Sequence, residues 1–287
     1  MTRPLLLACG AVLGLGLAAC STTTAAPDPG VRTEDAGVVD LDDLHINVSG
    51  HVAVLPEAQT LLQAHGQAPL SIDGAPLTIE EPLRVAVHDT SATVGAGTLA
   101  SDGAFHVMNV SVRDIHQGLA VGVSHEGLAH CTSIIFDTAF TGTRPHTDLV
   151  DAQAWVLPTA FVQALDAALG EARLRTHTEG RATTLEDAGF IVGRVVDANG
   201  HPVTGVRVVP DRTELSDRVY YPSEDLSTVT QDGTPASGLF VYVHTAKGLS
   251  TFHLGVEGAG GYVPRNVGTS AGLGIVLTMY PGRFPPP

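Results

Sequence analysis

The stretch Ile191–Val209, "IVGRVVDANGHPVTGVRVV", combines two runs rich in β-branched residues with two polar breaks. Valine and isoleucine favour extended backbone because branching at Cβ restricts rotation of the side chain. In the first break, Asn199-Gly200 supplies the positive backbone angles of a tight turn. The stretch therefore predicts two strands joined by a turn. It also raises the question whether Asp197, Asn199 and His201 form a site or only the turn.

Strand and turn patterns continue downstream. Further strands are expected at Ser227–Thr230, Leu239–Val243, Thr251–Val256 and Gly274–Met279. The order of turns and strands resembles the carboxypeptidase regulatory-like domain, a small transthyretin-like β-sandwich, over residues 189–280. The resemblance rests on Gly193-Arg194-Val195, Asp197, Gly200, Pro202-Val203, Gly205-Val206, Thr230, Asp232-Gly233, Leu239-Phe240-Val241 and Gly261-Tyr262. "DGTPASGLF" departs from the family pattern, which passes from the turn glycine straight into the next strand.

The first half repeats this scheme more faintly. Strands are expected in "INVSGHVAV", "EPLRVAVHD" and "GLAVGVSHEG", with a hairpin at Asp102-Gly103. A short helix is expected to begin at Pro56 and to end at Gly66. These patterns predict a second, divergent copy of the sandwich.

Between the two copies, apolar residues recur at helical spacing, as in Phe161, Leu165 and Leu169. A helix with one apolar face is expected to pack on a sandwich. The predicted fold class is mainly β, with two small transthyretin-like/Ig-like β-sandwiches joined by a helical segment. The predicted divisions are a signal peptide (1–19), a flexible tether (20–37), a divergent sandwich (38–142), a helical connector (143–188) and a regulatory-like sandwich (189–287).

The N-terminus reads as an export signal, with Arg3 before an apolar run from Leu5 to Ala19. The run is shorter than the roughly 20 residues of a spanning helix. Its ending, Leu17-Ala18-Ala19-Cys20, resembles the bacterial lipobox, which implies lipidation of Cys20. A secretory signal that happens to contain a cysteine is the alternative. Because Ser21 follows the cysteine, the resemblance implies sorting to the outer membrane of a two-membrane cell envelope.

Composition limits the partners. The formal net charge of −15 argues against nucleic acid and against anionic lipid headgroups. Of the three cysteines, Cys9 leaves with the signal and Cys20 is lipidated, so Cys131 stands alone. Its apolar flanks predict a buried, inert thiol.

Thirteen histidines raise the possibility of a metal site. His125, Glu126 and His130 are the candidates, but they lack the H-E-x-x-H spacing that places two imidazoles on one helix face. Ser124 in "GVSHEG" fails the spacing of a nucleophile elbow. Carboxypeptidases with a regulatory domain hold their zinc in a separate domain that this chain does not resemble. We therefore expect no enzyme, no metal and no cofactor.

An irregular acidic loop is the candidate contact surface. It lacks the glycine and the alternation of a calcium loop. Tyrosines on a loop bind partners at low entropic cost, although they would instead be core residues if they began a strand. The candidate binding residues are Asp211, Glu214, Asp217, Tyr220, Tyr221 and Glu224.

These features together predict a non-catalytic lipoprotein that the membrane holds through Cys20. Its β-sandwiches would serve adhesion, envelope structure or partner binding, with a protein or glycan as the unknown partner. A carbohydrate- or peptide-binding lipoprotein is the alternative, although an aromatic content of 5% weakens the carbohydrate version. A metal-dependent hydrolase is the least favoured hypothesis.

Overall fold

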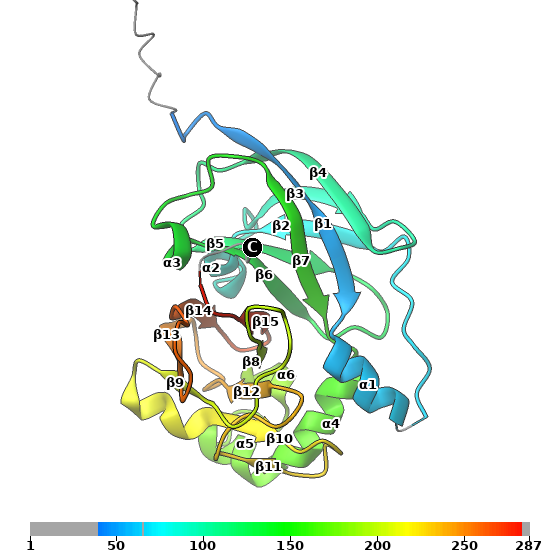
Figure 1. The fold of residues 1–287 in the computed structure, drawn as a ribbon, viewed down its shortest axis with the longest axis vertical. Coiled ribbons are helices and arrows are strands. Elements are labelled where there is room, and N and C mark those ends of the chain that lie inside the picture. Colours follow the sequence, from blue (N-terminus) through cyan, green and yellow to red (C-terminus); the bar gives the residue numbers. More distant parts are fainter. Residues whose placement is uncertain (1–39, 65, 283–287) are drawn as a thin grey trace, which may run out of the picture. The chain divides into compact units, whose positions relative to one another are not determined.

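A nine-stranded sheet runs through the structure, a computed structural model that describes residues 40–64 and 66–282 (Figure 1). The strand order is β11-β10-β12-β8-β15-β6-β5-β2-β3. The first half of the chain contributes β2 (Pro76–Glu80), β3 (Thr93–Thr98), β5 (Gly118–Val123) and β6 (Cys131–Asp137). The second half contributes β8 (Phe190–Val195), β10 (Val219–Pro222), β11 (Val229–Thr230), β12 (Leu239–Val243) and β15 (Gly274–Met279).

The two halves meet at β15, which lies between β8 and β6 and runs parallel to both. All described residues belong to one compact unit. The fold is mainly β, with several sheets and short helices, and the halves share their central sheet.

Two smaller sheets and a group of helices cover the central sheet. One small sheet has the order β4-β1-β7 and the other the order β14-β13-β9. Their strands are β1 (His45–Val54), β4 (Ala104–Ser111), β7 (Leu149–Val156), β9 (Arg207–Pro210), β13 (Ser250–Glu257) and β14 (Arg265–Thr269). The helices are α1 (Pro56–Ala64), α2 (Pro82–Ala86), α3 (Thr138–Thr141), α4 (Thr159–Leu169), α5 (Glu171–His177), α6 (Leu185–Ala188) and the 3₁₀ helix η1 (Thr213–Arg218).

Side-chain alternation decides which layer covers which face. On β6, Ile135 belongs to the core under β4-β1-β7, whereas its neighbour Ile134 packs on the core under β14-β13-β9. On β15, Val276 packs with the helices and Ile275 with β14-β13-β9. Because Val276 pairs with Ser133 of β6, the helices and the β4-β1-β7 sheet cover one face of the central sheet. The β14-β13-β9 sheet covers the other.

Several expected elements are present. Strands β12 and β15 have the expected bounds, β8 and β13 differ from them by a residue at either end, and α1 begins at Pro56 as expected. The apolar spacing around Phe161 forms α4, which buries that face in the core. Of the two turn residues expected to have positive φ, Gly200 has φ 82°, whereas Asn199 does not have a positive φ.

Four expectations were wrong. The second strand of the opening stretch, expected at Val203–Val209, begins only at Arg207 and pairs with β13 in place of β8. "EPLRVAVHD" is not a strand but the helix α2, because Pro82 starts it and the Glu81 carboxylate accepts a hydrogen bond from Arg84 N. Asp102-Gly103 does not close a hairpin, since β3 pairs with β2 while β4 pairs with β1. The connector expected from residue 143 begins with a strand, β7, which pairs in parallel with β1.

Candidate functional site

A cleft of about 910 Å³ opens between segments from both halves of the chain. This volume lies within the range of about 300–1,000 Å³ that ligand sites occupy. One wall is β7 with the loop before it, and the other is the end of β8 with the turn after it. The lining also includes residues of β6, α3, β14, β15 and the segment after β15: Ile134, Ile135, Phe136, Thr141, Arg265, Thr278 and Tyr280.

Trp155 and Arg194 connect the two walls. The Arg194 guanidinium carbon lies 5.0 Å from the centroid of the Trp155 ring, close enough for a cation–π interaction. Arg194 Nη1 also donates to Glu57 Oε1 of α1 at 2.9 Å, and the two side chains are only 12% and 9% exposed. Trp155 is the only tryptophan of the chain. The pair therefore holds an aromatic ring and a salt-bridged guanidinium in place at the cleft.

The turn 197–200 forms part of the opposite wall. Asp197 Oδ1 accepts hydrogen bonds from the backbone N–H of Asn199 at 2.8 Å and of His201 at 2.9 Å. These bonds, the one from His201 first, lower the pKa of the Asp197 carboxyl. The carboxylate thus stabilises the turn, and the turn presents Asn199 to the cleft.

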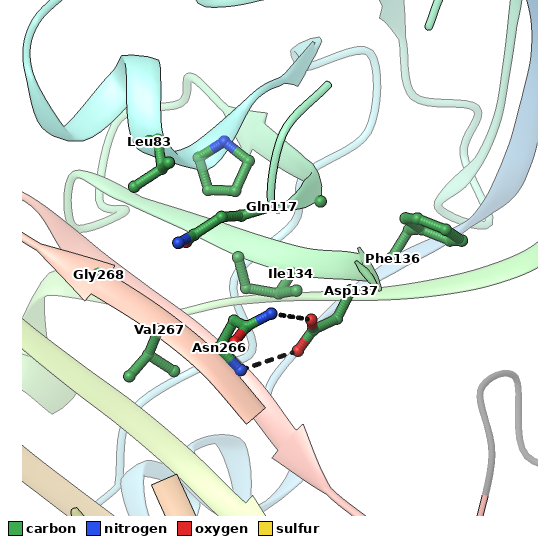
Figure 2. A pocket seen from close by; sticks show the side chains of 10 residues that line it. Leu83, Gln117, Ile134, Phe136, Asp137, Asn266, Val267 and Gly268 are labelled. Atoms are coloured by element: carbon green, nitrogen blue, oxygen red, sulfur yellow. Dashed lines mark hydrogen bonds between the residues drawn. The ribbon is translucent and has the colours of Figure 1, made fainter. Parts of the chain in front are cut away.

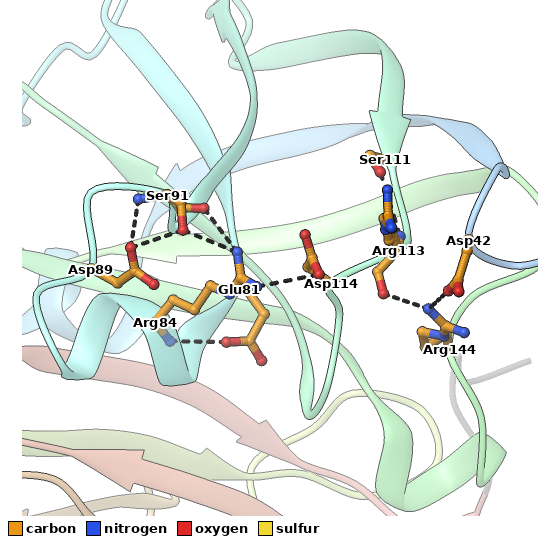
Figure 3. Close-up of polar contacts among 9 residues, drawn as sticks. All are labelled: Asp42, Glu81, Arg84, Asp89, Ser91, Ser111, Arg113, Asp114 and Arg144. Carbon is orange, nitrogen blue, oxygen red and sulfur yellow. Dashed lines mark hydrogen bonds and ion pairs between the residues drawn. The ribbon is translucent and has the colours of Figure 1, made fainter.

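Local partners already hold several charged groups around the cleft. Arg144 pairs with Asp42 at 2.8 Å and donates to the carbonyl of Arg113, as Figure 3 shows. Asp148 accepts hydrogen bonds from the backbone and the side chain of Asn47. These groups therefore hold the loop before β7 in place.

Asp151 has a different setting. It is exposed, lines the cleft and has φ 56°, close to a register shift in the pairing of β1 with β7. Among the described residues no donor reaches its carboxylate. Asp151 and Asn199 are therefore polar groups on opposite walls that a ligand can contact.

At the base of the cleft, Arg265 pairs with Asp137, and both side chains are buried. Asn266 donates its backbone N–H and its side-chain amide to the two oxygens of Asp137 (Figure 2). The adjoining cavity in Figure 2 measures about 10 Å³, room for a water molecule at most. This network is a structural support, because its charges are already matched.

The acidic loop predicted as a contact surface does not line the cleft. Tyr220 and Tyr221 lie in β10 and are buried, so the alternative interpretation of the tyrosines holds. Burial raises the pKa of both phenols. The acidic residues are exposed: Asp211 just before η1, Glu214 and Asp217 on η1, and Glu224 in the loop after β10.

Three of these four carboxylates have local partners. Asp211 accepts from the backbone N–H and Nδ1 of His253, and the backbone bond is the main cause of its lowered pKa. Glu214 pairs with Arg212, and Glu224 accepts from Ser237 N. The loop therefore has acidic groups on its surface without exposed tyrosines among them.

The structure separates the candidate metal ligands. His125 and His130 line a cavity of about 330 Å³, whereas Glu126 is exposed and does not line it. In residues 40–64 and 66–282, no three His, Cys, Asp or Glu side chains are grouped as a metal site requires. The two histidines thus share a cavity, but in the described part of the chain no third His, Cys, Asp or Glu side chain is grouped with them closely enough to complete a metal site.

Cys20, the signal and the tether lie outside the described residues. Cys131 is buried, and burial raises the pKa of its thiol to about 12. No helix among residues 40–64 and 66–282 is long and apolar enough to span a membrane.

Comparison with known proteins gives distant structural likenesses. No family model and no curated protein matches the sequence. The shaft pilin SpaA from Lactobacillus rhamnosus GG is 12% identical over 85% of this chain and 100% of that chain, with a TM-score of 0.23. The minor pilin GBS52 from Streptococcus agalactiae is 11% identical over 84% and 98%, with a TM-score of 0.22. At these scores the likeness supports no argument about function.

Proposed function

We propose that the chain is a non-catalytic, lipid-anchored binding protein of the cell envelope and that the cleft beside Trp155 holds its partner. The observation that carries the proposal is the cleft of about 910 Å³, lined by the only tryptophan together with polar groups on both walls. We also propose that the chain contains two transthyretin-like sandwiches. The support for this assignment is that each half packs a three-stranded sheet on the central sheet.

Strand addition to β7 is a poor way to fill the cleft. β7 pairs with β1 on one side, and its other edge faces the cleft near Asp151. A positive φ at Asp151 and a register shift distort this edge, and such bulges discourage pairing with another strand. Trp155 N already donates to Ser133 Oγ. A ligand that side chains recognise therefore fits better than an extended peptide.

We infer that the partner is a glycan. Asp151, Gln153 and Asn199 line the cleft with polar groups suited to hydroxyl groups, and Trp155 lines it with them. The structural use of Arg144, Arg265 and Asp148 supports a binding role over a catalytic one, because local partners already hold these charges.

The experiment is sedimentation of the mature chain, with Cys20→Ser to keep it in solution, with purified cell-wall polysaccharide. Asp151→Asn and Asn199→Ala should each weaken binding about tenfold, the loss of one good hydrogen-bonded contact. Asp232→Asn, at an exposed position outside the cleft lining, is the matched control. Equal binding by all variants, or no binding to any polysaccharide, would refute the proposal.

The anchor has its own test. Cys20→Ala should move the protein from the detergent phase to the aqueous phase and abolish incorporation of labelled palmitate. Equal partition of the wild type and this variant would exclude the lipid anchor without affecting the cleft.

A further inference from the structure

A second cavity, of about 330 Å³, lies over the central sheet beside α2 and shares no lining residue with the cleft. Strands β2, β5 and β6 form its floor, and Val85 of α2 and Leu273 contribute to its walls. His125 and His130 also line it. The cavity is therefore a separate site within the first half of the chain and its contact with β15.

The floor of this cavity is polar because of strand alternation. Gly122 of β5 is paired with Thr78 of β2 and with Thr132 of β6. Directly paired residues share a sheet face, and Glu80, two residues after Thr78, lies on that face too. The alternate residue Ile79 enters the core on the opposite face. Two hydroxyls and a carboxylate thus share this sheet face beneath the cavity.

In residues 40–64 and 66–282, no basic side chain forms an ion pair with the Glu80 carboxylate. Its Oε1 accepts a hydrogen bond from Thr78 Oγ1 at 2.6 Å. No lysine or arginine lines the cavity. Arg84 of the nearby α2 pairs with Asp114 and donates to Ser91 Oγ (Figure 3). A partly buried carboxylate without a cation favours a cationic ligand.

Gly122 makes room for this carboxylate. A Cβ at position 122 would lie 2.9 Å from both carboxylate oxygens of Glu80. Any side chain there would therefore displace the carboxylate. Glycine at position 122 therefore allows the Glu80 carboxylate to lie over the strands that form the floor of the cavity.

The other polar side chains of the cavity are only partly satisfied by described residues. Thr132 is 2% exposed, and its Oγ1 has no hydrogen-bond partner among the described residues. His125 Nδ1 donates to the Glu126 carbonyl at 2.6 Å, and His130 Nδ1 donates to the Gly272 carbonyl at 2.9 Å. In each neutral ring, Nε2 is then an acceptor. The cavity offers a set of acceptors to a ligand that carries donors.

We propose that this cavity binds a small molecule that carries a primary ammonium group and hydroxyl groups. The ammonium pairs with Glu80, and a ligand hydroxyl satisfies Thr132. A primary ammonium supplies three donors and one positive charge, which matches an acceptor-rich cavity with one carboxylate. The proposal does not depend on the function proposed for the cleft.

The test is calorimetry on the mature Cys20→Ser chain with glucosamine and glucose, which differ by an ammonium in place of a hydroxyl. Ethanolamine and ethylene glycol form a smaller pair with the same difference. In each pair the amine should bind on the order of tenfold more tightly, the gain of one charge-assisted contact. Glu80→Gln should remove that preference, and Glu126→Gln, an exposed position outside the cavity lining, should leave it unchanged.

If Glu80→Gln fails to fold, Gly122→Ala provides a second test. This variant keeps the negative charge of Glu80, but its added methyl group displaces the Glu80 carboxylate. It should weaken glucosamine binding on the order of tenfold, with a native circular dichroism spectrum. Thr132→Val should weaken both members of a pair alike. Equal affinity within each pair, no binding of either amine in the millimolar range, or binding of Zn²⁺ in place of the amines would overturn the proposal.

Discussion

Arg265 Nε lies 2.9 Å from Asp137 Oδ2, and the two side chains are only 3% and 2% exposed. Asp137 ends β6 in the first half of the chain, and Arg265 begins β14 in the second half. The Arg265 guanidinium also lies 5.4 Å from the Tyr280 ring centroid. This buried pair therefore connects the two halves at the base of the cleft.

Arg265→Met should lower the free energy of unfolding by about 3–5 kcal/mol, because it leaves the Asp137 charge buried without its partner. Urea denaturation measures the change. Arg212→Met breaks an exposed pair with Glu214, whose side chains are 45% and 63% exposed, and should cost no more than about 1 kcal/mol. Equal losses of unfolding free energy in the two variants would show that the buried pair contributes no more to stability than the exposed pair.

His177 should make the protein less stable in mild acid. Its Nε2 is 2.6 Å from the buried hydroxyl of Tyr220. Burial lowers the pKa of His177 below its ordinary value of 6.5. The unfolded state then binds more protons, so the free energy of unfolding falls as the pH drops through about 6.5.

His177→Gln should reduce this slope between about pH 7 and pH 5, where the unfolded state binds the proton and the folded state does not yet bind it. Tyr220→Phe should lower stability by about 1–3 kcal/mol, because it removes the partner of a buried nitrogen. Chemical denaturation over this pH range measures both effects. An unchanged slope in His177→Gln would assign the acid sensitivity to other groups.

Asp166 should have the opposite pH dependence. Desolvation by burial raises the pKa of Asp166 from 3.8 to about 6, and repulsion by Glu186 and Asp187 adds to the rise. The hydrogen bond of 2.7 Å from Leu185 N to Asp166 Oδ1 acts in the opposite direction. The folded state binds more protons between these two pKa values. The contribution of Asp166 to stability is therefore fully present below pH 3.8 and is lost as the pH rises through about 6.

Asp166→Asn should raise the free energy of unfolding by about 1–2 kcal/mol at neutral pH. This is less than the pKa shift alone would give, because the carboxyl is only partly buried and solvent screens its charge. The amide oxygen can still accept the bond from Leu185 N. The gain should disappear below pH 3.8, where Asp166 is neutral in both states. A gain that persists there would point to packing and not to charge.

Cys131 should report unfolding. Because its thiol is buried with a pKa of about 12, a maleimide should label it in the native Cys20→Ser chain only at the rate of opening. Urea should accelerate labelling along the unfolding curve. Fast labelling of the native protein would contradict the assignment of Cys131 as an inert core thiol.

Local patterns predicted the elements whose residues are chemically distinct. The β-branched runs of β8 and β15 and the apolar stripe of α4 carry strong signals. β7 was missed because its buried positions Ala152 and Ala154 alternate, yet alanine is a poor marker of strands. β14 was missed because "RNVGT" is polar and contains glycine.

The sites were harder to predict because they depend on strand register. Trp155 and Arg194 come from β7 and β8, with three helices between them, and neither has a motif around it. Glu80 and Thr132 share a sheet face only through β5. The single tryptophan and the alternation of Thr78 and Glu80 on β2 were the available signals. The two histidines noticed in the sequence, His125 and His130, line the second cavity. Their spacing did not point to the strand residues that form its floor.

The position of β15 also has a consequence for folding. Both of its neighbours, β8 and β6, precede it in the chain, and it is the last of the described strands. Until residues 274–279 insert, the central sheet is divided into two parts, each with an open edge that can associate with another molecule. A nascent chain that began to fold on the ribosome would expose these edges for as long as synthesis continued. Folding after release of the whole polypeptide avoids the period in which these edges are exposed. The insertion of β15 between β6 and β8 is then a slow step, because it joins strands that are far apart in the sequence.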